Sequence, residues 1–216
     1  MIPIADESPK GYIPFVNYVF IVLNILLFLL WQKQTVDFYM MYGLVPSHFL
    51  RAPLQPQNYL NVFTSMFMHG GWMHLLGNML YLWIFGDNIE YTVGHIRYFF
   101  FYLTVGSAAA FSQVLAYPAS AVPMVGASGA ISGVLGAYLI KYPRNKISIL
   151  FFFIIIIKVV RIPAAIVLSL WFAFQLINGY INFHPGSAEG VAWFAHVGGF
   201  IAGLILIKLF EKYPKR

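Results

Sequence analysis

The chain has 216 residues, of which 60% are hydrophobic and only 9% carry a charge. A soluble domain has about a quarter charged residues, and a core of this size cannot hide so much apolar surface. We therefore expect lipid to cover the remainder, as in an all-α, polytopic membrane protein. The net charge of +6 lies in short basic patches between apolar runs, which indicates membrane orientation and not a nucleic-acid partner. The absence of cysteine from the sequence excludes disulfides, thiol catalysis and thiolate metal sites.

The first predicted element is a membrane span over residues 13–31. This stretch lies between Lys10 and Lys33, carries no charge and is long enough for one helix. Asp6 and Glu7 precede it and no small-residue cleavage site follows it, so we interpret it as a retained span and not a signal peptide. The next residues, 32–60, mix aromatic and methionine side chains with prolines, which favours a first loop that lies in the membrane interface.

Five further spans are predicted, at residues 72–92, 97–116, 127–141, 163–182 and 191–210. Tyr117, Pro118 and Pro123 divide the long charge-free stretch in the middle of the chain into two helices joined by a turn. At the end of the second span, Glu90, Gly94 and Arg97 cluster in the sequence, which favours an ion pair that holds this turn.

One apolar run does not fit a span. Residues 147–157 are rich in Phe and Ile, but as a helix they would reach only about 16 Å, half the hydrocarbon thickness. We interpret the run 147–157 as an interfacial or protein-covered segment that leads into the fifth span, and the sequence leaves the structure of residues 147–161 open. The alternative is a longer, kinked fifth helix that contains Pro163.

Six spans place both termini, the loop after the second span and the loop after the fourth span on one side. The basic residues on that side are Lys10, Arg97, Lys141, Arg144, Lys146, Lys158, Arg161, Lys208, Lys212, Lys215 and Arg216. The opposite side has only Lys33 and Arg51. The excess of basic residues predicts cytoplasmic termini, in a cell inner or plasma membrane. The second, fourth and sixth spans then begin at the outer side, so residues near their N-terminal ends share a depth.

Ser128 lies at such an end, in the sequence Gly126-Ala127-Ser128-Gly129. The first N–H groups of a helix lack partners within it, so an oxyanion that forms on a carbonyl attacked by Ser128 would meet the serine's own amide. The alternative is structural: Gly126, Gly129 and the following glycines form a small-residue packing stripe, and Ser128 is a neutral cap. Close packing of this kind would also bring a partner helix within reach.

His196 lies about six residues into the last span, roughly 9 Å below its start. Gly199 and Gly203 follow at i+3 and i+7, so all three residues share one face. That face can pack against the glycines of the fourth span and direct the imidazole toward Ser128. A histidine hydrogen-bonded between helices is the alternative, although an ionisable group within a span is by default a functional candidate.

In the second span His74 and Asn78 are spaced i and i+4, so both project from one face and both can donate hydrogen bonds to an anion. With the Ser128 amide they would form a three-donor oxyanion site, and His69 is assigned a supporting polar role. A zinc site is the competing interpretation of these histidines. The sequence has no H-E-x-x-H motif and no carboxylate in the outer halves of these spans, so we expect no metal and no cofactor. Asp87 lies about 13 Å beyond Asn78, too far to orient His196, which leaves a dyad as the serine arrangement.

Together, these motifs resemble those of the rhomboid intramembrane serine proteases. The match comprises His69, His74 and Asn78; Gly126-Ala127-Ser128-Gly129; and Ala195-His196 with Gly199 and Gly203. The resemblance implies one six-helix rhomboid-like domain over residues 1–216, with Ser128 as nucleophile and His196 as general base. It also implies single-span membrane proteins as substrates, a membrane-embedded first loop, and a gating fifth helix that here would include Trp171, Phe172 and Phe174.

The sequence departs from the family pattern at two places. Leu60 and Asn61 stand where many members have Trp-Arg, and Ser132 stands where some members have a tyrosine that stacks on the histidine. His196 must therefore be held by packing or by hydrogen bonds. Two other functions compete with the protease: a catalytically inactive relative that binds membrane helices, and a small transporter with a polar lining. The dyad residues present and the lack of half-repeats or midplane carboxylates favour the protease.

Overall fold

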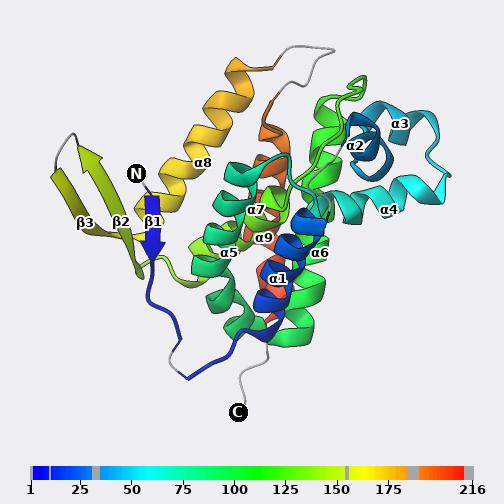
Figure 1. The fold of residues 1–216 in the computed structure, drawn as a ribbon. Helices are drawn as coiled ribbons and strands as arrows, with labels where there is room; N and C mark the ends of the chain where they lie inside the picture. Colours follow the sequence, from blue (N-terminus) through cyan, green and yellow to red (C-terminus); the bar gives the residue numbers. More distant parts are fainter. Residues whose placement is uncertain (1, 10, 31–34, 154–155, 184–189, 212–216) are drawn as a thin grey trace.

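The computed structural model describes residues 2–9, 11–30, 35–153, 156–183 and 190–211. Within them the chain is mostly helical, with one small sheet at the side of the helical bundle (Figure 1). The helices are α1 (Phe15–Leu30), α2 (Val36–Tyr42), α3 (Pro46–Arg51), α4 (Pro56–Thr64), the 3₁₀ turn Ser65–Phe67, α5 (Trp72–Val93), α6 (His95–Ala116), α7 (Ser128–Lys141), α8 (Ala164–Ile181) and α9 (Trp193–Phe210). The strands are β1 (Ile2–Ala5), β2 (Lys146–Phe153) and β3 (Ile156–Pro163).

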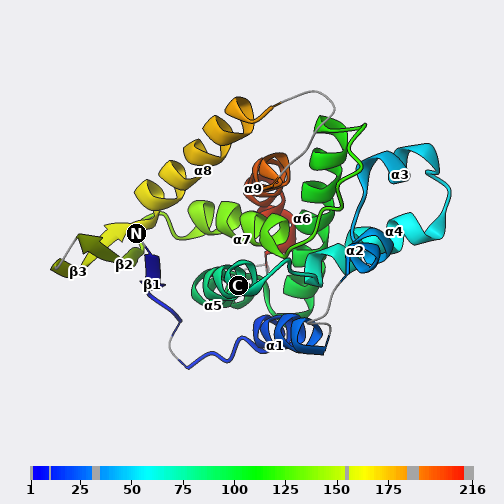
Figure 2. The same ribbon diagram turned by 45° about the horizontal axis from the view of Figure 1, so that its top comes forward.

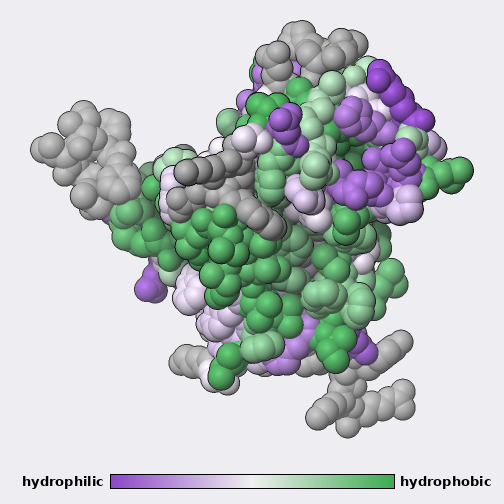
Figure 3. Space-filling model, turned by 45° about the vertical axis from the view of Figure 1, so that its right-hand side comes forward, coloured by the Kyte–Doolittle hydropathy of each residue, from purple (hydrophilic) through white to green (hydrophobic). Residues whose placement is uncertain are grey.

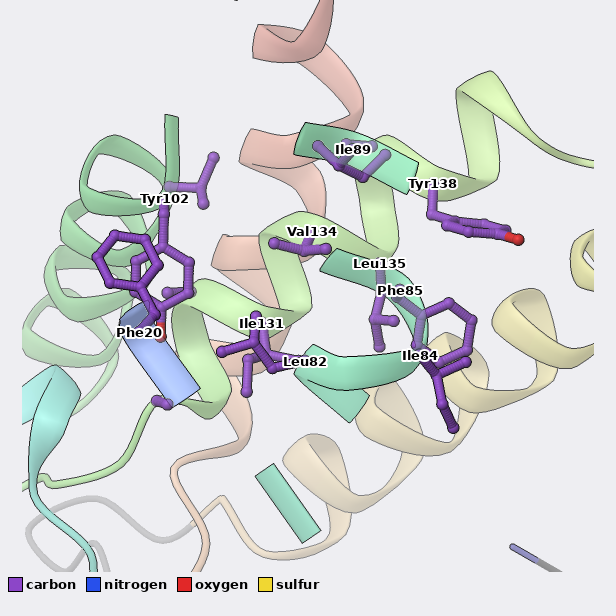
Figure 4. Close-up of a cluster of buried hydrophobic side chains, with 14 of the residues drawn as sticks. Phe20, Leu82, Ile84, Phe85, Ile89, Tyr102, Ile131, Val134, Leu135 and Tyr138 are labelled. Carbon is purple, nitrogen blue, oxygen red and sulfur yellow. The ribbon is translucent and has the colours of Figure 1, made fainter. Parts of the chain in front are cut away.

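Helix α7 forms the centre of the bundle, between α5, α6 and α9, while α8 runs along its outer side (Figure 2). Every residue of α7 from Gly129 to Tyr138 is buried, which explains why this helix is apolar or small on all its faces. Ile131, Val134 and Leu135 pack in a cluster with side chains of α1, α5 and α6 (Figure 4). The central position of α7 keeps its N-terminal residue, Ser128, within the protein.

The outer surface of the bundle is apolar. Helix α1, for example, exposes Val22, Leu26 and Leu30 while it buries Asn17 and Asn24. Figure 3 shows an apolar band across the middle of one face, with hydrophilic residues gathered above and below it. Three helices in the described part of the chain, α6, α8 and α9, are long and apolar enough to cross a membrane, and α1 is a shorter apolar helix. The fold is therefore an all-α, polytopic membrane bundle.

The predicted interfacial loop folds as the short helices α2, α3 and α4. Its residues 32–34, which include Lys33 of the predicted outer side, lie outside the described part of the chain. Asn61, one of the two departures from the family pattern, is 7% exposed and donates a hydrogen bond to the carbonyl of Gly43 at 3.0 Å. Tyr39 of α2 donates to the carbonyl of His69 at 3.2 Å. These bonds attach the loop to itself and to the segment that precedes α5.

The apolar run before Pro163 forms a β-hairpin, so the kinked-helix alternative is wrong. Strands β2 and β3 pair antiparallel from Lys146 with Pro163 to Phe153 with Ile156. Strand β1 adds antiparallel to the other edge of β2. The run is rich in β-branched and aromatic residues, which favour strands once a neighbouring strand satisfies the backbone groups. The hairpin leads directly into α8 (Figure 1).

Asp6 attaches the N-terminal segment to the bundle. Its carboxylate accepts hydrogen bonds from Tyr138 of α7 at 2.5 Å and from Asn88 of α5 at 2.6 Å. Burial raises the pKa of Asp6 to about 6, although the bond from Tyr138 acts in the opposite direction.

The turn between α5 and α6 is held differently from the prediction. Glu90 is fully buried, and its carboxylate pairs with the ring of His95 and not with Arg97. Its two carboxylate oxygens also accept from the backbone N–H groups of Val16 and Asn17 at 3.0 and 2.7 Å, which caps the start of α1. Arg97 donates to the backbone carbonyl of Glu211.

Candidate active site

The structure brings Ser128 and His196 into direct contact. Ser128 is the first residue of α7, His196 lies in the first turn of α9, and the Nε2 atom of His196 is 2.9 Å from the Oγ atom of Ser128. This is hydrogen-bonding distance between a hydroxyl and an imidazole, the arrangement in which the imidazole can remove the hydroxyl proton. The two residues are 68 positions apart in the chain, so only the packing of α7 on α9 joins them.

Glycines make this packing close. A Cβ atom added to Gly199 would stand 2.1 Å from the carbonyl oxygen of Gly129, and one added to Gly203 would stand 1.9 Å from that of Gly133. A Cβ added to Gly136 would meet the carbonyl oxygen of Phe200 at 2.1 Å. The predicted glycine faces of the two helices therefore lie backbone against backbone, and the small-residue stripe and the Ser128–His196 contact are parts of one arrangement.

Sequence reasoning missed one residue of the site, Gln175 of α8. This side chain is 4% exposed, and its Oε1 atom lies 2.8 Å from the Nδ1 atom of His196. The signal that could have identified it is a polar side chain within a predominantly apolar span. Trp171 and Trp193 also lie beside the imidazole, with ring centroids 6.1 and 6.2 Å away.

A cavity of about 690 Å³ contains these groups and is bounded by α5 on one side and α8 on the other. Its polar lining comprises His74, Asn78, Ser128, Ser132, Gln175 and His196, together with the hydroxyl-bearing Tyr81. The described residues that line it include no Asp or Glu, so this cavity presents a serine and a histidine without a carboxylate. Its remaining lining is apolar or glycine.

Two side chains from α5 face this cavity as potential donors. The Nδ2 atom of Asn78 is buried and has no hydrogen-bond partner among the described residues. The Nδ1 atom of His74 accepts a hydrogen bond from the backbone N–H of Gly70 at 3.4 Å, which leaves Nε2 as the ring's N–H donor. His74, Asn78 and Ser128 thus line one cavity, and their use as a three-donor oxyanion site stays a prediction.

Gly126 allows His74 to approach the serine. Its φ angle is +126°, a conformation that favours glycine, and an added Cβ atom would stand 2.6 Å from the Nε2 atom of His74. The amide of Gly126 donates to the carbonyl of Ser65 at 2.8 Å, which fixes the loop before α7. Gly126 is therefore needed both for its backbone conformation and for the space it leaves.

His69 lies behind the donors. It is fully buried and packs edge to face on His74, with ring centroids 5.1 Å apart. Burial, and to a smaller extent His74, lowers the pKa of His69 to about 3, so the ring is neutral at neutral pH. Within the described residues no three His, Asp or Glu side chains gather to hold a metal ion.

The predicted gate residues take two different positions on α8. Phe172 stacks on Phe200 of α9 at 4.4 Å, and Trp171 lies 5.9 Å from the same ring. Phe174 is 56% exposed and contacts Trp193. Ser132, at the second departure from the family pattern, donates to the carbonyl of Ser128 at 2.6 Å.

Comparison with known proteins identifies the family of the chain. The sequence-family model of the rhomboid domain matches residues 56–213. The chain is 32% identical over 155 residues to Rhomboid-like protein 11, chloroplastic, from Arabidopsis thaliana, covering 70% of this chain and 52% of that protein. It is 28% identical over 215 residues to Rhomboid protein 1, mitochondrial, from Saccharomyces cerevisiae, covering 92% of this chain and 55% of that protein. The chain thus spans about half the length of these relatives, and it belongs to the rhomboid family.

Proposed function

We propose that this protein is an intramembrane serine endopeptidase that cleaves single-span membrane proteins with Ser128 as nucleophile and His196 as general base. The observation that carries the proposal is the 2.9 Å contact between Ser128 Oγ and His196 Nε2 inside a largely apolar cavity. Membership of the rhomboid family supports the same reaction class.

The first step is acylation of the serine. His196 Nε2 takes the proton of Ser128 as Oγ attacks a peptide carbonyl, and the carbonyl oxygen becomes an anion. The Ser128 amide, Asn78 Nδ2 and His74 Nε2 stabilise this anion, and their preorganisation is the largest expected contribution to the rate. The unpartnered Nδ2 atom of Asn78 supports this role, because a buried donor normally has a partner.

The intermediate then collapses. His196 returns the proton to the leaving amine, the C–N bond breaks and an acyl-serine forms. Water attacks this ester with His196 again as base, which releases the second product and restores the hydroxyl.

The substrate enters as an extended segment. Helical hydrogen bonds shield a peptide carbonyl, so the substrate helix must unwind at the cleavage site, and residues that destabilise helices favour cleavage. The cavity lies between α5 and α8, so we propose entry from the lipid between these two helices. Cytoplasmic termini and cleavage near the outer leaflet, in a cell inner or plasma membrane, belong to the same proposal and rest on the distribution of basic residues.

The test is covalent labelling of the detergent-solubilised protein with a serine-directed fluorophosphonate. We expect labelling of the wild type and none of Ser128→Ala or His196→Ala, together with wild-type cleavage of a reconstituted single-span substrate. Ser112→Ala is a matched control, since its hydroxyl donates to the carbonyl of Ala108 and does not line the cavity. Labelling that persists in Ser128→Ala would place the reactive nucleophile at another residue and overturn the proposal. A wild type that is neither labelled nor active on the substrate would overturn it in favour of an inactive helix-binding relative.

A further inference from the structure

Gln175 is an unusual residue for its position. The buried residues of α8, a helix described along its whole length, are Ala164, Leu168, Gln175 and Gly179, which form one stripe that faces the bundle. Gln175 is the only polar residue in this stripe, while its neighbours Phe174 and Leu176 are exposed. An uncompensated amide at such a place is costly, so its contacts show what it does there.

Those contacts determine how the amide is oriented. The Nε2 atom of Gln175 lies 3.4 Å from the backbone carbonyl of Trp171, which can only accept a hydrogen bond. The NH₂ group therefore faces Trp171, and the Oε1 atom faces His196 Nδ1 at 2.8 Å. An acceptor at this distance requires Nδ1 to carry the hydrogen.

The tautomer of His196 follows from this orientation. A neutral imidazole with its hydrogen on Nδ1 has a lone pair on Nε2, and Nε2 is the atom that faces Ser128 Oγ. With the amide reversed, Nδ1 would accept, Nε2 would carry the hydrogen and the ring could not take the serine proton. When the ring does take that proton, Nδ1–H still donates to Oε1, so the same bond also stabilises the imidazolium.

The other neighbours of the imidazole cannot set the tautomer. Trp171 and Trp193 contact it through their rings. Ser132 uses its hydroxyl on the carbonyl of Ser128. Among the residues that the structure describes, Gln175 is thus the one side chain that hydrogen-bonds to the second nitrogen of His196.

We propose that Gln175 is the positioning residue of the site: it holds His196 in the tautomer and orientation that receive the proton of Ser128. This inference rests on the proposed function. The neutral amide would thus orient the histidine as the carboxylate does in a Ser-His-Asp triad. An ionised carboxylate at this place would have to be buried, which is costly.

The kinetic test compares Gln175→Leu and Gln175→Glu with wild type. Leu removes the acceptor with little change in size, and we expect kcat to fall about 10- to 100-fold with KM nearly unchanged, as for a lost hydrogen bond to a group that becomes charged. Glu retains an acceptor oxygen but would have to bury its carboxyl group, so kcat should fall less than in Gln175→Leu without reaching the wild-type value. Asn178→Leu is the matched control. Asn178 is about one turn further along α8, and among the described residues its side chain donates only to the backbone carbonyl of Phe174, so kcat of this variant should equal that of wild type.

A second readout does not need turnover. In full-length Ser128→Ala labelled with ¹⁵N-histidine, the His196 signals are identified by their loss in the additional variant His196→Gln. We expect a protonated Nδ1 and an unprotonated Nε2, and a mixture of tautomers when Gln175→Leu is added. Unchanged kcat in Gln175→Leu, or an unchanged tautomer, would overturn the inference. Failure of the protease proposal would appear separately: the wild type would not react with the fluorophosphonate, while His196 would still have the Nδ1–H tautomer.

Discussion

Gly199 of α9 lies directly against the backbone of Gly129 of α7, so that a Cβ atom on Gly199 would stand 2.1 Å from the Gly129 carbonyl oxygen. Gly129 follows Ser128 in the chain, and Gly199 is three residues after His196. This contact therefore sets the separation between the two helices at the level of the Ser128–His196 hydrogen bond.

We expect Gly199→Ala to lower both activity and stability. The added methyl group meets backbone atoms, which cannot rotate away, so the helices must separate, at a cost of about 1–3 kcal/mol. Cleavage of a single-span substrate and unfolding in detergent measure the two effects. Gly77→Ala of α5 is the control for stability. Apart from its chain neighbours and its own helix backbone, no atom of the described residues lies within 4 Å of its added Cβ atom. Equal unfolding curves for Gly199→Ala and Gly77→Ala would contradict the prediction.

We expect Gly126→Ala to disable the site without unfolding the bundle. The methyl group would displace His74, and a φ angle of +126° is unfavourable for alanine. Loss of one oxyanion donor lowers the rate by about 10²–10³. The measurement is kcat in wild-type and His74→Ala backgrounds. Because the His74 ring is already absent from the second background, Gly126→Ala should lower kcat by a smaller factor there than in wild type. The same factor in both backgrounds would exclude the steric explanation.

Asn78→Ala should lower kcat about 10²–10³-fold with little change in KM. The Nδ2 atom of Asn78 has no hydrogen-bond partner among the described residues, so its removal breaks no hydrogen bond of the substrate-free protein. The thermal unfolding midpoint should therefore move little. Steady-state cleavage and thermal unfolding of the same preparation separate these effects. Normal turnover would remove Asn78 from the donor set.

Asp6 should make stability depend on pH. Its pKa rises from 3.8 to about 6 in the folded protein because the carboxyl is buried, so the folded state binds a proton more tightly than the unfolded chain. The free energy of unfolding is therefore expected to fall as pH rises from 3.8 to about 6, and to level off above. Unfolding in detergent across this range measures the slope.

The variant Asp6→Asn should reduce this slope. Glu7→Gln, at the next position and exposed to solvent, removes the same charge and is the control. A slope that survives Asp6→Asn unchanged would assign the pH dependence to another group.

The sequence predicts the main elements of this site well because its signals are local. The distribution of charges predicts the direction of the spans, and that direction predicts which helix ends share a depth, so Ser128, His196, His74 and Asn78 can be grouped without coordinates. Glycine spacing adds the helix faces that pack. The rhomboid motifs lie on these same helix ends, which is why the family could be proposed from the sequence.

The hairpin and Gln175 could not be predicted in this way. The run of Phe and Ile before Pro163 has no periodicity that separates strand from helix, and its pairing with β1 joins residues far apart in the chain. Gln175 lies in an apolar helix whose inward face depends on how α8 rests on α9.

The sequence by itself thus determined the membrane character of the chain and the candidate residues, and it predicted a common depth for them, because hydropathy, charge and spacing are properties of neighbouring residues. Only the tertiary structure decided the contact between Ser128 and His196, the acceptor on Nδ1 and the strand pairing before α8, because each depends on close packing between segments that are distant in the chain.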